Sequence, residues 1–178
     1  MGNIVNSLQN RVVHIENVPT PSMKNLTDAQ IKIIKSTWDI PAAKPLDSGE
    51  KILYMYFDKF PHNQQQFVAF RNTPLMSLKG TPGFRSHANK IMTVFSTAID
   101  CLGKPGGMEE IIKLLNEVGK SHKRRGISKK AFNELREIIL QVLSQVCHLD
   151  DEGKDAWNSL LDTVYHVIFT NLDEKKVF

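Results

Sequence analysis

The stretch TPGFRSHANKIMTVFSTAIDCL, residues 81–102, decides the fold class of this 178-residue chain. Its apolar side chains recur at every third or fourth position, which is the period of an amphipathic α-helix. Pro82 falls in the first turn, where a missing N–H leaves no helical hydrogen bond unmade. The run GKPGG at 103–107 then breaks the pattern. The stretch therefore predicts one long helix, and its inward face is expected to consist of Phe84, Ala88, Ile91, Val94, Phe95, Ala98 and Leu102.

The chain on both sides of this helix shows the same succession of amphipathic stretches and breakers. Before it, Thr27 and Gln30 have the spacing of a capping box, and Pro41 is expected to stop the helix that they open. After it, Ser128 is placed to cap a helix, and Asp151 lies where the helix macrodipole favours negative charge. No convincing β-strand alternation is present. The sequence predicts an all-α protein, with further helices at about 52–60, 111–122, 128–146 and 150–172.

Length and local composition predict a single packed domain with short extensions. A chain of 178 residues can bury a substantial core. Residues 1–26 contain prolines, asparagines and serines but no sustained helical pattern, so we expect a flexible N-terminal extension there. The packed domain is expected to cover 27–173, and a short tail is expected at 174–178.

Charge and cysteine content exclude several classes of protein. The net charge is +4, the basic residues are spread along the chain, and no nucleic-acid-binding module is present, so we expect no nucleic-acid partner. No apolar run approaches the roughly 20 residues that span a bilayer, and the N-terminus lacks the pattern of a secretory signal. Cys101 and Cys147 are expected to be reduced thiols of a cytoplasmic protein, with a regulatory disulfide between them as the alternative.

Two of the six histidines extend apolar helical faces. His87 lies three residues after Phe84 and one turn before Ile91, and His122 lies four residues after Val118. A single histidine on such a face is usually a hydrogen-bonded core residue. Two on separate helices facing one interior favour a shared ligand, because neutral imidazole is a common metal ligand. The spacing alone leaves both interpretations open, whereas structural roles explain the other four, His14, His62, His148 and His166.

The order and spacing of six landmarks between about residues 27 and 172 resemble those of the globin family. No single landmark is decisive, and the match rests on all of them appearing in the same order. The resemblance implies an all-α globin fold, with about seven to eight helices around a pocket for haem b. In chain order the landmarks are Trp38, Leu53, Phe60-Pro61 with Phe67, His87, Ile91, and Ser121-His122 followed by Ile127.

This resemblance also implies roles for individual residues. His122 corresponds to the proximal ligand of the haem iron, and His87 corresponds to the distal histidine. Ser121, through its hydroxyl or its backbone carbonyl, is a candidate partner for the second ring nitrogen of His122. Phe67 is expected to stack on the porphyrin. The expected apolar walls of the pocket are Leu53, Ile91 and Val118.

Three basic residues are candidates for pairing with the haem propionates. Lys90 lies one turn beyond His87, where it is expected either to meet a propionate at the mouth of the pocket or to be an ordinary exposed lysine. Arg124 and Arg125 follow His122, and stabilisation of the helix C-terminus explains them equally well.

Two features depart from the globin pattern. The loop between the two histidine-bearing helices is longer than in myoglobin, and the glycine-rich segment at 103–107 can absorb this because added loop length changes stability little. The N-terminal extension is absent from short oxygen-storage globins. It resembles the tails of the cytoglobin-like and globin X-like branches, so we expect an invertebrate globin of that kind.

The resemblance implies reversible binding of O2, and of NO and CO, in oxygen storage or transport. Histidines on both faces leave two states open: His87 stands off the iron, or it bonds to the iron in a six-coordinate haem, which the branch favours. The alternative function is enzymatic, as a nitric oxide dioxygenase or nitrite reductase that needs an external electron-donating reductase. A redox sensor tethered to a membrane and a helical adaptor without haem are further alternatives.

The sequence Met1–Ser7 resembles an N-myristoylation signal at Gly2. Asn6 is a weaker choice than Ser or Thr at its position, and one acyl chain gives only marginal membrane binding. An unmodified start is the alternative. We expect a cytoplasmic protein that associates with membranes if Gly2 is acylated, and the sequence leaves monomer and homodimer open.

Overall fold

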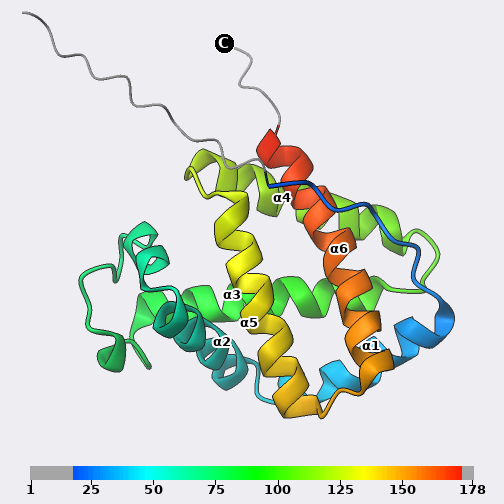
Figure 1. Cartoon of the computed structure of the whole chain (residues 1–178), viewed down its shortest axis with the longest axis horizontal. Coiled ribbons are helices and arrows are strands. Elements are labelled where there is room, and N and C mark those ends of the chain that lie inside the picture. Colours follow the sequence, from blue (N-terminus) through cyan, green and yellow to red (C-terminus); the bar gives the residue numbers. More distant parts are fainter. Residues whose placement is uncertain (1–17, 174–178) are drawn as a thin grey trace, which may run out of the picture.

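Helices account for all regular secondary structure between residues 18 and 173, the part of the chain that this computed structural model describes. The α5 and α6 helices lie side by side, and α3 crosses the molecule (Figure 1). The all-α fold class predicted from the sequence is confirmed within these limits. The elements are α1 (Asp28–Ala42), α2 (Pro45–Lys59), the 3-10 helices η1 (Pro61–Gln66) and η2 (Leu75–Ser77), α3 (Pro82–Cys101), α4 (Gly107–Arg124), α5 (Lys129–Cys147) and α6 (Asp151–Asp173).

Helix α1 begins with the capping box that the sequence predicts. Thr27 Oγ1 accepts a hydrogen bond from the Gln30 amide at 3.2 Å, and the Gln30 side chain accepts one from the Thr27 amide at 3.0 Å. The expected stop at Pro41 is wrong by one residue, because Pro41 lies inside the helix and Ala42 ends it. Proline lacks a donor but keeps its acceptor, and the Pro41 carbonyl still accepts from the Lys44 amide.

Asparagines, glutamines and prolines between residues 61 and 81 predict an irregular segment between α2 and α3, and the structure is more ordered there. The Gln64 side chain is buried, and its amide donates to the carbonyls of Phe70 and Thr73 at 3.0 and 2.7 Å. A buried amide needs such partners. These bonds fold the segment back on itself, and the rings of Phe67 and Phe70 stack with centroids 5.0 Å apart.

Two glycines let the helices that carry the candidate histidines lie close to their neighbours. A Cβ on Gly49 of α2 would lie 2.6 Å from the carbonyl oxygen of Ala88, the residue after His87 in α3. A Cβ on Gly119 of α4 would lie 2.8 Å from Cβ of Asn171 in α6. Because a side chain at either position would clash with its neighbour, the two glycines fix the placement of α3 and α4.

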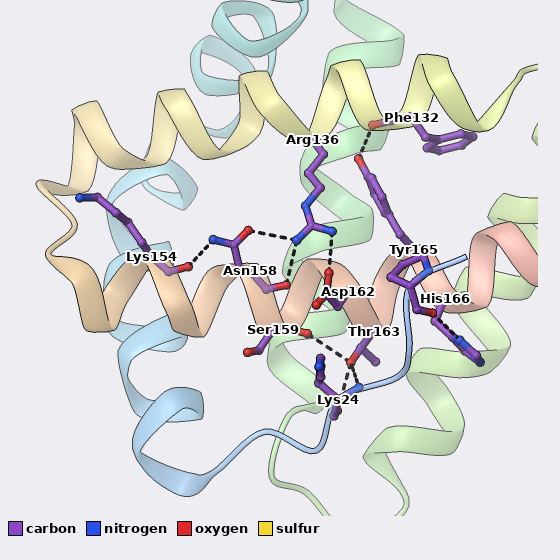
Figure 2. Close-up of polar contacts among 11 residues, drawn as sticks. Lys24, Phe132, Arg136, Lys154, Asn158, Ser159, Asp162, Thr163, Tyr165 and His166 are labelled. Carbon is purple, nitrogen blue, oxygen red and sulfur yellow. Dashed lines mark hydrogen bonds and ion pairs between the residues drawn. The ribbon is translucent and has the colours of Figure 1, made fainter. Parts of the chain in front are cut away.

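The segment 18–26 runs along α6 in extended conformation (Figure 1, dark blue), and we call it the strap. The amide of Lys24 donates to Thr163 Oγ1 at 3.0 Å, and the same hydroxyl lies 3.1 Å from the Lys24 carbonyl (Figure 2). His166 Nδ1 donates to the carbonyl of Pro21 at 2.9 Å. The flexible extension expected at 1–26 therefore does not include 18–26, since these bonds tie the backbone to α6. The remainder of that extension, 1–17, and the tail expected at 174–178 lie outside the described residues.

Polar contacts join α5 to α6 beside the strap (Figure 2). The guanidinium of Arg136 donates to Asp162 Oδ1 at 2.7 Å and to Asn158 Oδ1 at 3.0 Å. The Tyr165 hydroxyl, on a buried side chain, donates to the carbonyl of Phe132 at 2.7 Å. A buried hydroxyl that is hydrogen-bonded in this way helps to fix the start of α5, and with it the Phe132 ring.

Candidate functional site

The imidazole of His122 is oriented by its own helix. It lies in the last turn of α4, and its Nδ1 is 2.8 Å from the carbonyl oxygen of Val118. Because a carbonyl can only accept, Nδ1 carries the proton and Nε2 keeps its lone pair. The Phe132 ring of α5 meets the imidazole edge-to-face, with centroids 5.0 Å apart. The orientation of His122 therefore rests on one hydrogen bond and one aromatic contact.

The partner of His122 is a backbone carbonyl, as the resemblance implies, but it is not that of Ser121, the candidate named from the sequence. Both the carbonyl and the hydroxyl of Ser121 accept from the guanidinium of Arg125, the carbonyl at 2.7 Å. Val118, one turn earlier in α4, supplies the carbonyl instead. A histidine ring in a helix reaches back toward the preceding turn, because side chains tilt toward the helix N-terminus.

The candidate His87 lies on α3, against the segment between α2 and α3. The Phe67 ring meets the His87 imidazole edge-to-face, with centroids 4.9 Å apart. Phe67 in turn packs against Phe57 of α2, with centroids 5.0 Å apart. The structure therefore brings together two residues, His87 and Phe67, that the sequence assigns to one site.

Both imidazoles are neutral near pH 7. Burial, with smaller contributions from the charges of His122, Lys90 and Arg125, lowers the pKa of His87 to about 4. Burial also lowers the pKa of His122, against the hydrogen bond to Val118, which raises it. The two imidazoles come from α3 and α4, which pack against each other.

The three predicted apolar wall residues lie on the three helices that the sequence assigns to the site. Leu53 of α2 is 1% exposed and belongs to the main core. Ile91 of α3, one turn beyond His87, and Val118 of α4 are half-buried and pack against that core. Their placement is compatible with walls of one pocket, and that role stays a prediction.

Two of the three basic candidates act electrostatically on the site. Lys90 is exposed on α3, and its charge contributes to the lowered pKa of His87. Arg125, in the turn after α4, lowers the pKa of both His87 and His122. Positive charge from α3 and from the α4–α5 turn therefore converges on the two imidazoles, and carboxylate groups of a ligand would be favoured there.

Sequence reasoning missed Phe132 and Phe57 as residues of the site. Helical spacing places Phe132 on the apolar face of the helix predicted at 128–146, and in the structure its ring packs on His122. Phe57 likewise supports Phe67 from α2. Helical spacing showed that both side chains point inward, but it carries no information on which inward residue meets which partner.

The chemistry of this site suits a metal bound within a planar organic ring. Among residues 18–173, no three or more His, Cys, Asp or Glu side chains gather as metal ligands. Two neutral imidazoles alone would leave a metal ion short of ligands, whereas a porphyrin supplies the in-plane nitrogens. Phe67 and the half-buried Ile91 and Val118 offer apolar surface for such a ring. Fold and site together define an all-α protein suited to haem.

Comparison with known proteins shows the family. A family model described as Globin matches residues 50–168. A globin of the midge Chironomus thummi thummi, CTT-IIIA, is 37% identical over 156 residues, which are 88% of this chain and 97% of that protein. The chain therefore belongs to the globin family, and this membership implies haem as its cofactor.

Two structures of Drosophila melanogaster proteins show the same fold. A globin matches with a TM-score of 0.79 and 39% identity, covering 82% of this chain and 94% of its own. A haemoglobin described as hexa-coordinate, in a study of cyanide binding, matches with a TM-score of 0.78 and 39% identity, over 81% of this chain and 94% of its own. These relatives are insect globins, and the narrower cytoglobin-like or globin X-like branch stays a prediction.

Two further expectations concern membranes. None of the helices in the described range is long and apolar enough to cross a bilayer. Gly2, the expected acylation site, lies outside the described residues.

Proposed function

We propose that this globin holds haem b between α3 and α4 and reversibly binds O2, and also NO and CO, in oxygen storage or transport. The observation that carries the proposal is that α3 and α4 pack against each other and that each carries one imidazole, His87 or His122, held edge-to-face by a phenylalanine ring. When bound, haem supplies an iron centre whose axial positions accept an imidazole nitrogen or a diatomic gas.

His122 is the proposed proximal ligand. Its Nδ1–H donates to the Val118 carbonyl, which leaves Nε2 as the coordinating nitrogen. Such a hydrogen bond fixes the ring orientation and raises the basicity of the ligand. Burial keeps the ring neutral, and the edge of Phe132 limits its rotation. His122 is thus preorganised to bind the metal.

His87 is the proposed distal histidine, and we propose that it bonds to the iron in the ligand-free protein. A pKa of about 4 leaves its ring nitrogen free to coordinate at neutral pH. The 39% identity to a Drosophila haemoglobin described as hexa-coordinate supports this state. An external ligand must then displace His87. The apparent affinity for that ligand equals the intrinsic affinity multiplied by the fraction of molecules in which His87 is off the iron.

Lys90 and Arg125 are the proposed partners of the haem carboxylates. Both charges act on His87, and Arg125 is itself oriented by the carbonyl and hydroxyl of Ser121. Both residues are exposed, but an arginine held by hydrogen bonds loses less rotamer freedom on binding a carboxylate than a lysine does. We therefore expect Arg125 to contribute more to haem retention than Lys90.

The visible absorption spectrum of the haem-loaded protein tests this function. A ferrous, ligand-free spectrum with split and sharp bands is expected for two axial imidazoles, and O2 and CO should replace it reversibly. A single broad ferrous band would refute six-coordination while leaving gas binding intact. Failure to bind either gas would refute the proposed function itself.

A further inference from the structure

One long segment of the chain carries basic residues and no acidic ones. Five of the 23 basic residues, and none of the 19 acidic residues, lie between Lys59 and Ile99. The rest of the chain is therefore close to neutral. This segment contains the loop from η1 to α3 and the whole exposed side of α3 up to its last turn.

The same segment carries the two most exposed large apolar side chains of the described residues. Met76 is 90% exposed and Val68 is 76% exposed, while the next, Ile40 of α1, is 50% exposed. The loop that carries Val68 and Met76 forms one end of the molecule, at the left of Figure 1. Side chains with such exposure project from the surface and lie in no groove.

Three cations flank these apolar side chains. Arg71 and Lys79 are exposed on the loop, and Arg85 is exposed in the first turns of α3. Within the part of the chain that is described, none of the three pairs with a carboxylate, whereas Lys59 at the near end of the segment pairs with Glu137. The Lys79 ammonium instead lies over the Tyr54 ring, 5.4 Å from its centroid.

We propose that this end of the molecule docks on an anionic lipid surface. The docking surface consists of Val68, Arg71, Met76, Lys79 and Arg85. The two apolar side chains enter the headgroup layer, and the three cations pair with the phosphate and carboxylate groups of the lipids. Each basic residue near an anionic membrane surface adds to the free energy of binding. Exposed apolar side chains strengthen binding further when they are buried among the lipid headgroups.

The observations favour a lipid surface over an acidic protein. Protein interfaces commonly combine concave and convex regions, and they carry charges of both signs that fix the register of the partners. Here the apolar side chains project, and the exposed charges of the segment have one sign, since the carboxylate that meets the loop belongs to the buried Glu50 and accepts from the Gly80 amide. Two hollows of the described surface lie elsewhere, along α1 and the turn at 102–104. An anionic lipid surface is uniform in its plane, so binding to it requires only projecting apolar side chains and cations, and this end of the molecule has both.

Vesicle co-sedimentation of the full chain, produced in bacteria so that Gly2 is unmodified, tests the proposal without reference to haem. The wild type should sediment with vesicles of phosphatidylcholine and phosphatidylserine at low salt and not with phosphatidylcholine alone. Since each basic residue near the surface contributes about fivefold, the triple variant R71E/K79E/R85E should bind at least ~100-fold more weakly. The matched triple K32E/K44E/K113E changes the net charge by the same amount, at exposed lysines of α1, the α1–α2 junction and α4. It should weaken vesicle binding much less than R71E/K79E/R85E does.

A second pair of variants tests the apolar contribution. The double variant V68D/M76D should lose most of the binding, while Ile40→Asp, at the next most exposed apolar side chain, should lose little. Far-UV circular dichroism confirms that each variant is folded. The proposal is overturned if the wild type ignores anionic vesicles, if the two triple variants lose binding equally, or if only soluble poly-L-glutamate is bound. Each of these results leaves gas binding by the haem untouched.

Discussion

The Nδ1 atom of His122 lies 2.8 Å from the carbonyl oxygen of Val118, so the ring is held by the turn of α4 that precedes it. This bond decides which ring nitrogen faces the interior, because Nδ1 is used as a donor and Nε2 is left with its lone pair. The bond is local to one helix and does not depend on loops or on the strap. The candidate iron ligand is therefore oriented by the most regular part of its surroundings.

Truncation of Phe132 should loosen His122 from the other side. Phe132 is buried, and its ring contacts the His122 imidazole with centroids 5.0 Å apart. We expect Phe132→Ala to lower the free energy of unfolding by about 3–5 kcal/mol and to accelerate haem loss, while Phe132→Leu should lose much less of both. Urea unfolding and haem transfer to excess apomyoglobin measure the two effects. Unchanged haem loss in Phe132→Ala would show that the aromatic contact has no part in holding His122.

Replacement of His87 should change the coordination state without removing haem. We expect His87→Leu to convert split ferrous bands into one broad band, and CO association to become faster because no internal ligand must leave. The matched control His148→Leu, at an exposed C-cap outside the site, should leave both unchanged. Stopped-flow CO binding provides the measurement. A His87→Leu spectrum identical to the wild type would remove His87 from the iron.

Acid should destabilise the haem-free chain through His87. Its pKa in the folded state is about 4, below the value of about 6.5 for an unfolded histidine, so between these values the unfolded chain binds the proton more readily. Stability is then complete above this window and falls as pH decreases through it. From about pH 7.5 to about pH 5 the loss should be about 2 kcal/mol from this residue.

Urea unfolding of the haem-free wild type and of His87→Leu at the two pH values measures that contribution. The variant lacks the titrating ring, so its stability should depend less steeply on pH across the window. Parallel curves for the two proteins would contradict the assignment of a buried, neutral imidazole.

The strap should depend on Thr163. Its side chain is 1% exposed, and its hydroxyl meets both the amide and the carbonyl of Lys24. Thr163→Val would leave the part-buried amide and carbonyl of Lys24 without this partner, so we expect a loss of about 1 kcal/mol and faster hydrogen exchange at 18–26. Thr170→Val, which removes an exposed hydroxyl bonded within α6, is the control. Equal exchange in the two variants would show that Thr163 does not fasten the strap.

The parts of the fold that sequence reasoning reached are those set by local patterns. The Thr27–Gln30 capping box and the Ser128 cap are confirmed, because each needs only residues within one helical turn. Helical periodicity also placed His87 on an inward face, the globin resemblance assigned Phe67 to the same site, and the structure brings the two rings into contact. The spacing of residues within one helix determines which side of the helix a side chain faces, and predictions of this kind need no information on distant contacts.

The parts that sequence reasoning missed depend on choices among near neighbours or on distant contacts. The His122 ring reaches back to the Val118 carbonyl one turn earlier, whereas its sequence neighbour Ser121 accepts from Arg125. The strap has no periodic pattern, since its bonds run from its backbone to side chains of α6 about 140 residues away. Sequence spacing carries no information on such pairs.

Haemin titration of the wild type and of His122→Gly tests the central claim most directly. The wild type should take up one haem per chain with a sharp Soret band, and the variant should bind haem weakly with a shifted band until added imidazole restores the wild-type spectrum. A wild type that stays colourless with haemin, or a variant that matches it in both affinity and spectrum, would contradict His122 as the iron ligand.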